Sequence, residues 1–184
     1  MPEKPPAIPP FKLEHHGSYN DHLMRAAQFH LVQLSTMADM KANMLLTMSS
    51  VVISLTLPQL YKNMHQWPLF ILVGSCLLTI CLAAYAVMPK LPPQNGEAPD
   101  VNHPGFNPLF FGDFTRMTQA HFEATMADIM SDPSRTYGAQ VRELYLLGTF
   151  LARKKYRFLR WGYVSFITGL FASSIGFIIL TFQS

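Results

Sequence analysis

Residues 67–87 read WPLFILVGSCLLTICLAAYAV, an uninterrupted run without Lys, Arg, Asp or Glu. A helix needs about 20 mostly apolar residues to cross the roughly 30 Å hydrocarbon core of a membrane. Residues 43–61 and 161–184 also lack those four residue types. The whole chain is 49% hydrophobic and only 14% charged, which is a low charged fraction for a soluble protein. The sequence therefore predicts an integral membrane protein with transmembrane helices at residues 43–60, 67–87 and 161–182.

The residues between the spans predict helices outside the membrane. Apolar residues recur at three- and four-residue steps through residues 18–42, and no helix breaker separates them from the first span. Residues 114–160 contain helical periodicity up to the third span, interrupted where Asp132 is placed to cap a helix that begins at Pro133. The predicted fold is all-α: three transmembrane helices, with a cytoplasmic helical bundle formed by extensions of the first and third spans and a short helix.

Two segments are too rich in proline for regular structure. Residues 1–17 hold five prolines and the sequence KPPAIPP, which predicts a disordered tail without a core. Residues 90–110 are rich in Pro, Gly and Asn, which predicts a linker. The linker leads into LFFGDF at residues 109–114, whose four large apolar side chains need a surface. We expect this turn to dock on the helices or on the membrane. Residues 18–182 then form one membrane domain.

Basic residues predict the orientation of the chain. The loop between the first two spans carries only Lys62, whereas the run RKKYRFLR at residues 153–160 precedes the third span. Lys and Arg are enriched on the cytoplasmic side of membrane proteins, which predicts a cytoplasmic N-terminus and an external C-terminus. No apolar run with a cleavage site is readable near Met1, so we expect the first span to direct its own insertion. The net charge of +3 follows from this anchoring and does not indicate a nucleic-acid polymer as partner.

The sequence contains no arrangement typical of an enzyme. It has no Gly-rich phosphate loop, no His and Glu at zinc spacing, and no recognisable Ser, His and Asp motif. The neighbouring His15 and His16 point in different directions on any regular backbone, which argues against a metal site. Cys76 and Cys81 both fall in the second span, where we expect small packing residues and no disulfide. We therefore expect a protein without catalytic residues, cofactor or metal.

A polar seam runs along the first predicted helix and enters the membrane. At 3.6 residues per turn its members share one face within about 120°. They are Ser35, Asp39, Asn43, Thr47, Ser50 and Ser54. Polar groups inside a membrane avoid lipid, so the seam either bonds a neighbouring helix, which we favour, or lines a pore.

Asp39 lies where this seam meets the membrane. Asp39 and Lys41 are two positions apart and do not face each other on a helix, so each needs another partner. We expect Asp39 to bond a cation of residues 153–160. An anionic ligand would compete for that cation, which makes Asp39 and Lys41, with the seam, candidate switch residues.

The basic run RKKYRFLR interleaves cations with aromatic residues. This pattern suits an anionic ligand held by charge and stacking. It also suits membrane anchoring, which the sequence alone favours. The candidate ligand-binding residues are Arg142, Tyr145, Lys154, Lys155, Tyr156 and Arg157.

The third span carries a stripe of small residues at alternating three- and four-residue steps. Its members are Gly162, Ser165, Gly169, Ala172 and Gly176. Such stripes allow helix backbones to approach closely in lipid. The partner helix belongs either to the same chain or to a second copy, and the sequence does not choose between them.

Four motifs together resemble one bacterial family. They are ADMKANMLL at residues 38–46, FFGDF at 110–114, YLLG at 145–148 and KYRFLR at 155–160. In this order and spacing they resemble the Pycsar transmembrane effectors, which are PycTM-like antiphage proteins. The resemblance covers residues 21–182, nearly all of the predicted membrane domain.

The resemblance implies a function. Infection would prompt a neighbouring nucleotide cyclase to make a cyclic pyrimidine mononucleotide, cCMP or cUMP. The effector, acting in the lipid bilayer of the bacterial inner membrane and as a homo-oligomer, would then impair that membrane and halt the infected cell. The resemblance supplies no ligand-contact motif, so the candidate residues above rest on charge and stacking. The alternative is a constitutive membrane scaffold or small transporter subunit without a nucleotide switch.

Overall fold

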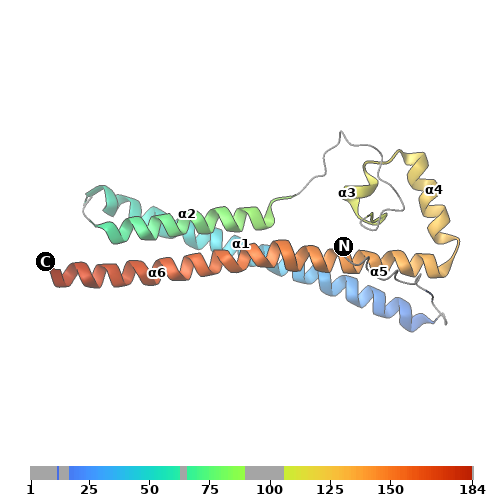
Figure 1. Ribbon diagram of the computed structural model, residues 1–184, viewed down its shortest axis with the longest axis horizontal. Coiled ribbons are helices and arrows are strands. Elements are labelled where there is room, and N and C mark those ends of the chain that lie inside the picture. Colours follow the sequence, from blue (N-terminus) through green and yellow to red (C-terminus); the bar gives the residue numbers. More distant parts are fainter. Residues whose placement is uncertain (1–11, 13–16, 63–65, 90–105, 184) are drawn as a thin grey trace, which may run out of the picture. The chain divides into compact units, whose positions relative to one another are not determined.

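The computed structural model describes residues 12, 17–62, 66–89 and 106–183. Within this part of the chain all regular structure is helical (Figure 1). The elements are α1 (Ser18–Lys62), α2 (Trp67–Val87), α3 (Phe111–Phe114), α4 (Gln119–Met130), α5 (Pro133–Phe150), the π-helix η1 (Leu151–Tyr156) and α6 (Arg157–Gln183). The predicted proline-rich tail, apart from residues 12 and 17, and most of the predicted linker lie outside the described residues.

Three helices are long and apolar enough to cross a membrane, which confirms the predicted class of an all-α membrane protein. They are α1, α2 and the continuous helix that runs through α5, η1 and α6. Only 17% to 22% of the most apolar window in each is buried inside the protein. Most of the apolar surface of these windows is therefore available to lipid.

The chain divides into two compact units. The membrane unit comprises residues 32–89 and 149–184, and the second unit comprises residues 1–31 and 90–148. Helix α1 continues from one unit into the other at Leu31, and α5 does so at Gly148.

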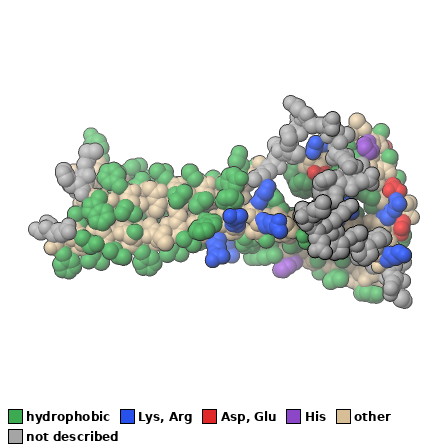
Figure 2. Space-filling model, viewed as in Figure 1, with side chains coloured by type: hydrophobic (Ala, Val, Ile, Leu, Met, Phe, Trp, Pro, Cys, Tyr) green, Lys and Arg blue, Asp and Glu red, His purple; other side chains and the backbone are tan. Residues whose placement is uncertain are grey.

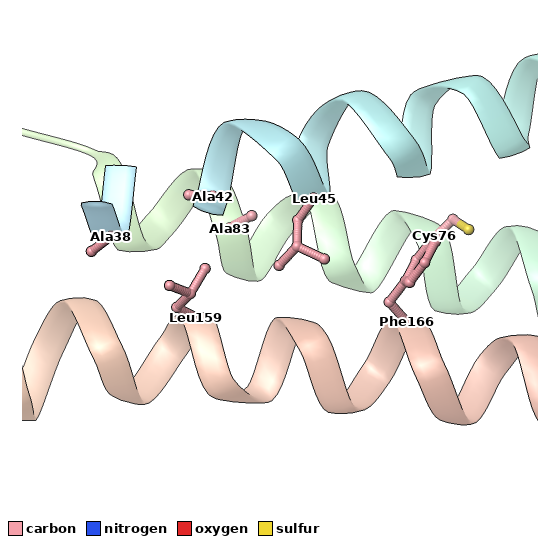
Figure 3. Packing of buried hydrophobic residues seen from close by; sticks show 7 residues of the cluster. All are labelled: Ala38, Ala42, Leu45, Cys76, Ala83, Leu159 and Phe166. Atoms are coloured by element: carbon pink, nitrogen blue, oxygen red, sulfur yellow. The ribbon is translucent and has the colours of Figure 1, made fainter. Parts of the chain in front are cut away.

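The core of the membrane unit is formed by small and medium-sized side chains from three helices (Figure 3). Its fully or nearly buried members are Ala38, Ala42 and Leu45 of α1, Cys76 and Ala83 of α2, and Leu159 and Phe166 of α6. Cys76 packs as predicted, but Cys81 is exposed. The prediction was wrong for Cys81 because α2 buries only one narrow face, and Cys81 lies five positions beyond Cys76, off that face.

Helices α2 and α6 pack closely against each other in the membrane unit. A Cβ atom at Gly169 would overlap the Ser75 side chain, and one at Gly176 would lie 2.8 Å from the Trp67 ring. Ser165 Oγ donates a hydrogen bond to the Ser75 carbonyl oxygen at 3.2 Å. The small residues of α6 therefore let α2 approach closely within one chain.

One member of the predicted small-residue stripe does not face α2. Ala172 is exposed, and Ser173, which is only 3% exposed, occupies the buried position instead. The reason is helical phase, because each residue advances the direction by about 100°. Relative to Gly162, Ser173 is turned by about 20° and Ala172 by about 80°.

In the second unit, the first part of α1 packs along α5. Gln28 Nε2 donates to Glu143 Oε2 at 2.8 Å, and Tyr137 donates to Asp21. The hydrogen bond to Asp21 raises the pKa of Tyr137, because loss of the phenol proton would place two negative charges side by side. The predicted extensions of the first and third spans are thus in contact, whereas their position in the cytoplasm stays a prediction.

The turn before α4 is held by its own hydrogen bonds. Asp113 Oδ2 accepts from the Asn107 backbone N–H at 2.9 Å, and Asn107 Oδ1 accepts from Leu109 N–H at 3.0 Å. Phe106 is buried at 4% exposure, although the sequence did not single it out.

One of the large side chains in LFFGDF packs on another helix, whereas docking on the membrane surface stays a prediction. Phe114 packs on Phe122 of α4 with ring centroids 5.1 Å apart, but Phe110 and Phe111 remain 43% and 51% exposed. In the short helix α3 the side chains point in several directions, so only some of them reach α4.

Polar side chains cap the next two helices, and the cap at Asp132 was predicted. Thr118 Oγ1 accepts from the His121 backbone N–H at 3.3 Å at the start of α4. Asp132 Oδ1 accepts from the Ser134 N–H at 2.9 Å, and α5 begins at Pro133. Each polar side chain satisfies a backbone donor that the first turn of a helix leaves unpaired.

Candidate functional site

Asp39 and Lys155 form an ion pair between α1 and η1 in the membrane unit. Lys155 Nζ lies 2.8 Å from Asp39 Oδ1 and 2.8 Å from Oδ2, and it donates to Ser35 Oγ at 2.9 Å. An ammonium group has three donors, so all three are used here. The partner expected for Asp39 within the basic run is present, and it is Lys155.

The two side chains differ in their access to solvent. The Lys155 side chain is 15% exposed and that of Asp39 is 42% exposed. A mostly buried ammonium is costly without a partner, so removal of Asp39 would leave Lys155 needing another anion. This requirement is the chemical basis for a competing ligand.

The cation sits in an unusual piece of helix. Residues 151–156, LARKKY, form a six-residue π-helix between α5 and α6. A π-turn is uncommon and is often found at functional sites. Its wider turn accommodates an extra residue, so two consecutive side chains contact α1: Lys155 reaches Asp39, and Tyr156 Oη donates to the Leu34 carbonyl oxygen at 3.0 Å.

The remaining predicted ligand residues are placed differently. Lys154 and Arg157 are exposed, and Lys154 Nζ lies 5.7 Å from the centroid of the Phe150 ring. Arg142 and Tyr145 are exposed on α5 in the other unit, with Tyr145 at 69%. Lys155 and Tyr156 are therefore the members already bonded to α1, while Lys154 and Arg157 are open to a ligand.

Basic side chains gather where α6 begins (Figure 2). Beyond this cluster the visible surface over α2 and α6 shows green hydrophobic side chains among tan atoms and carries neither blue nor red side chains. Cations at the boundary of an apolar helix are typical of the membrane interface.

The C-terminal part of the polar seam, from Asn43 to Ser54, faces away from the rest of the described membrane unit. Asn43, Thr47, Ser50 and Ser54 are exposed, and so is Lys41. Thr47 and Ser54 bond the backbone carbonyl oxygens of Asn43 and Ser50, each at 2.9 Å. Ser35 and Asp39, at the N-terminal end of the seam, hydrogen-bond to Lys155 of η1.

Sequence reasoning missed three polar residues that face the core. Ser49 and Thr79 are fully buried and Thr56 is 7% exposed. Thr79 Oγ1 lies 3.4 Å from the Gly162 carbonyl oxygen, next to its bond to Ser75 O at 2.8 Å. These positions lie at helical spacing from the buried alanines and cysteine. The spacing could have predicted their burial, but their polar side chains argued against it.

No group of three or more His, Cys, Asp or Glu side chains occurs among the described residues in an arrangement that could hold a metal. His15 and His16 lie outside those residues.

The model of the Pycsar effector protein domain, PycTM, matches residues 22–181. The match spans most of the chain and includes the ion pair, the π-helix and all three apolar helices. The chain belongs to the Pycsar effector family. Comparisons with curated proteins and with solved structures gave no match.

Membership places this Pycsar effector in antiphage defence. Together with the three apolar helices, it also makes the protein a multi-pass membrane protein that contacts lipid. The resemblance found in the four sequence motifs is thereby confirmed.

Proposed function

We propose that a cyclic pyrimidine mononucleotide, cCMP or cUMP, activates this Pycsar effector. A partner nucleotide cyclase makes the nucleotide during infection, and the activated effector impairs the bacterial inner membrane and halts the infected cell. The protein acts without catalysing a reaction, as a homo-oligomer with its N-terminus in the cytoplasm. The observation that carries the proposal is the Asp39–Lys155 pair, held in a π-helix at the start of a membrane helix.

Charge competition links the nucleotide to this pair. A cyclic phosphodiester carries a single negative charge, as the Asp39 carboxylate does. Because Asp39 and Ser35 already use every donor of Lys155, the phosphate gains this cation only by displacing them. The exposed Lys154 and Arg157 provide a first point of contact for the anion.

Displacement changes how the helices of the membrane unit are joined. Asp39 is the charged contact of α1 with η1, so its release loosens α1 beside α6. A ligand shifts such an equilibrium only by its difference in affinity for the two states. The nucleotide must therefore bind more tightly to the arrangement in which Asp39 is displaced.

The test is a titration of the purified protein with cCMP and cUMP, following binding and oligomer size together, with cAMP as the purine control. We expect saturable binding of one pyrimidine nucleotide and a change in oligomer size. Lys155→Gln should weaken binding by about ten- to a hundredfold, because a hydrogen bond to a charged group contributes about 1.5–3 kcal/mol. The control is Lys62→Gln, which removes an exposed cation at the far end of α1 from Asp39 and should bind like the parent.

Two results would contradict the proposal. The first is no binding of either pyrimidine nucleotide by folded protein, which would favour a constitutive scaffold or transporter subunit. The second is equal loss of affinity in Lys155→Gln and Lys62→Gln, which would show only a general effect of positive charge.

A further inference from the structure

The membrane-spanning part of α1 has three chemically different faces. At about 100° per residue these faces lie roughly 120° apart around the helix. The inner face holds the buried Ala42, Leu45, Ser49 and Thr56. An apolar outer face holds Met44, Met48, Val51 and Leu55, which are 52% to 71% exposed. A polar outer face holds the exposed Asn43, Thr47, Ser50 and Ser54.

The polar outer face is poorly suited to lipid. Thr47 and Ser54 satisfy their hydroxyl donors on their own backbone, which a serine or threonine can do inside a membrane helix. Among the described residues, no other side chain forms a hydrogen bond with the Asn43 amide or with the Ser50 hydroxyl. Asn43 needs more partners than Ser50, because a carboxamide has two N–H donors and an acceptor oxygen. Hydrocarbon offers such groups no partner, so leaving them exposed to lipid is costly.

Among the residues that the structure describes, no helix covers this face, since Asn43, Thr47, Ser50 and Ser54 are all exposed. Helix α2 packs on α6, where Gly169 lies against Ser75 and Gly176 lies against Trp67 and Pro68. Helix α1 uses its inner face for the shared core. The described helices of the membrane unit therefore leave this face open to a partner.

The chemistry of the face fits a second copy of the same chain. A carboxamide both donates and accepts, and so does a hydroxyl. Identical residues that meet around a symmetry axis can therefore satisfy each other. The short side chains of Ser50 and Ser54 also permit the close approach that membrane helices need for such bonds.

We propose that the polar outer face of α1 is the self-association surface of this effector, with Asn43 and Ser50 of neighbouring copies meeting at the axis. When more than two copies assemble, the same face surrounds a polar path through the membrane. The self-association is independent of the nucleotide, whereas its use as the route of membrane damage rests on the proposed function.

Cysteine cross-linking in isolated membranes tests this surface. In a background of Cys76→Ala and Cys81→Ala, Ser50→Cys should give a disulfide-linked dimer on mild oxidation. Met48→Cys is the matched control, because it lies about 3 Å away along the axis and on the apolar outer face. We expect at least fivefold more dimer from Ser50→Cys. Equal or greater cross-linking from Met48→Cys would overturn the proposal.

A second variant tests the same surface without introducing a cysteine. Asn43→Leu should lower the assembled fraction in detergent while membrane abundance is retained, whereas Met44→Leu should leave it unchanged. Assembly of Asn43→Leu equal to that of the parent would also overturn the proposal. If the protein binds nucleotide but Ser50→Cys does not cross-link, the self-association surface is wrong and the proposed function stands. If Ser50→Cys cross-links but the protein binds no nucleotide, the proposed function is wrong and the self-association surface stands.

Discussion

At the scale of single residues, Lys155 has no unused hydrogen-bond donor. Its three N–H groups meet two oxygens of Asp39 and one of Ser35 at 2.8 to 2.9 Å. An anion therefore cannot simply add to this cation and has to replace a partner. Because every donor of Lys155 is used, an anionic ligand that binds Lys155 must break its bonds to Asp39 or Ser35. The ion pair is therefore a candidate site for detecting such a ligand.

Asp39→Asn should separate charge competition from structural support. The substitution keeps the size and an acceptor oxygen but removes the charge that opposes an incoming phosphate. We expect nucleotide affinity at least equal to that of the parent, and toxicity without any signal, measured at matched membrane abundance. Asp128→Asn, which alters the exposed pair with Arg135, is the control and should change neither property.

The opposite outcome for Asp39→Asn would be weaker nucleotide binding and no resting toxicity at equal abundance. Asp39 would then be a structural partner of Lys155 or a part of the binding pocket itself.

Residue chemistry predicted that Asp39 would bond a cation, but not which one. On a regular α-helix the basic run offers several cations at similar depth, and the π-turn decides that Lys155 and Tyr156 both contact α1. No spacing of apolar or polar residues distinguishes LARKKY from an α-helix. The choice of Lys155 was therefore accessible only from the structure.

At the scale of elements, α2 and α6 depend on small residues for their close packing. Gly169→Leu or Gly176→Leu should separate the two helices, because a side chain would collide with Ser75 or with Trp67. Overpacking of this kind costs about 1–3 kcal/mol. We expect lower thermal stability in detergent and lower toxicity, with membrane insertion retained.

Gly74→Leu is the matched control for these two variants. A Cβ atom at Gly74 of α2 would meet nothing within 4 Å, so this leucine should leave stability close to that of the parent. If all three variants were equally stable, the contact between α2 and α6 would not be what supports the unit.

Helix positions were more predictable than helix faces. The second span was predicted at residues 67–87, which are the residues of α2, because its flanks and length left no alternative. The stripe on α6 included Ala172 where Ser173 is buried, since small residues at both positions fit the pattern equally well. Composition identifies a stripe of small residues, but only the packing against α2 shows which of two neighbouring small residues is buried.

At the scale of the whole molecule, orientation in the membrane determines which compartment supplies the ligand. The basic run at residues 153–160 predicts that this part is cytoplasmic and that the C-terminus is outside. Reporter fusions at Ser184 and near residue 96 should report opposite compartments. If both fusions reported the same compartment, the three-span arrangement would be wrong.

The fold class followed from charge-free runs of the right length, because a bilayer imposes a strict physical requirement. The outward direction of Asn43 and Ser50 did not follow, because a polar seam in a membrane helix suits either a helix of the same chain or another copy. The structure shows which side of α1 is covered by the other described helices of the membrane unit.

The most direct measurement of the proposed mechanism is release of a trapped dye from liposomes that contain the purified effector. Nucleotide is supplied on both sides, so that the orientation of inserted protein does not matter. We predict that cCMP or cUMP causes release, with a half-maximal concentration close to the measured dissociation constant, and that cAMP does not. Saturating pyrimidine nucleotide that binds the protein but causes no more release than buffer alone would contradict the mechanism.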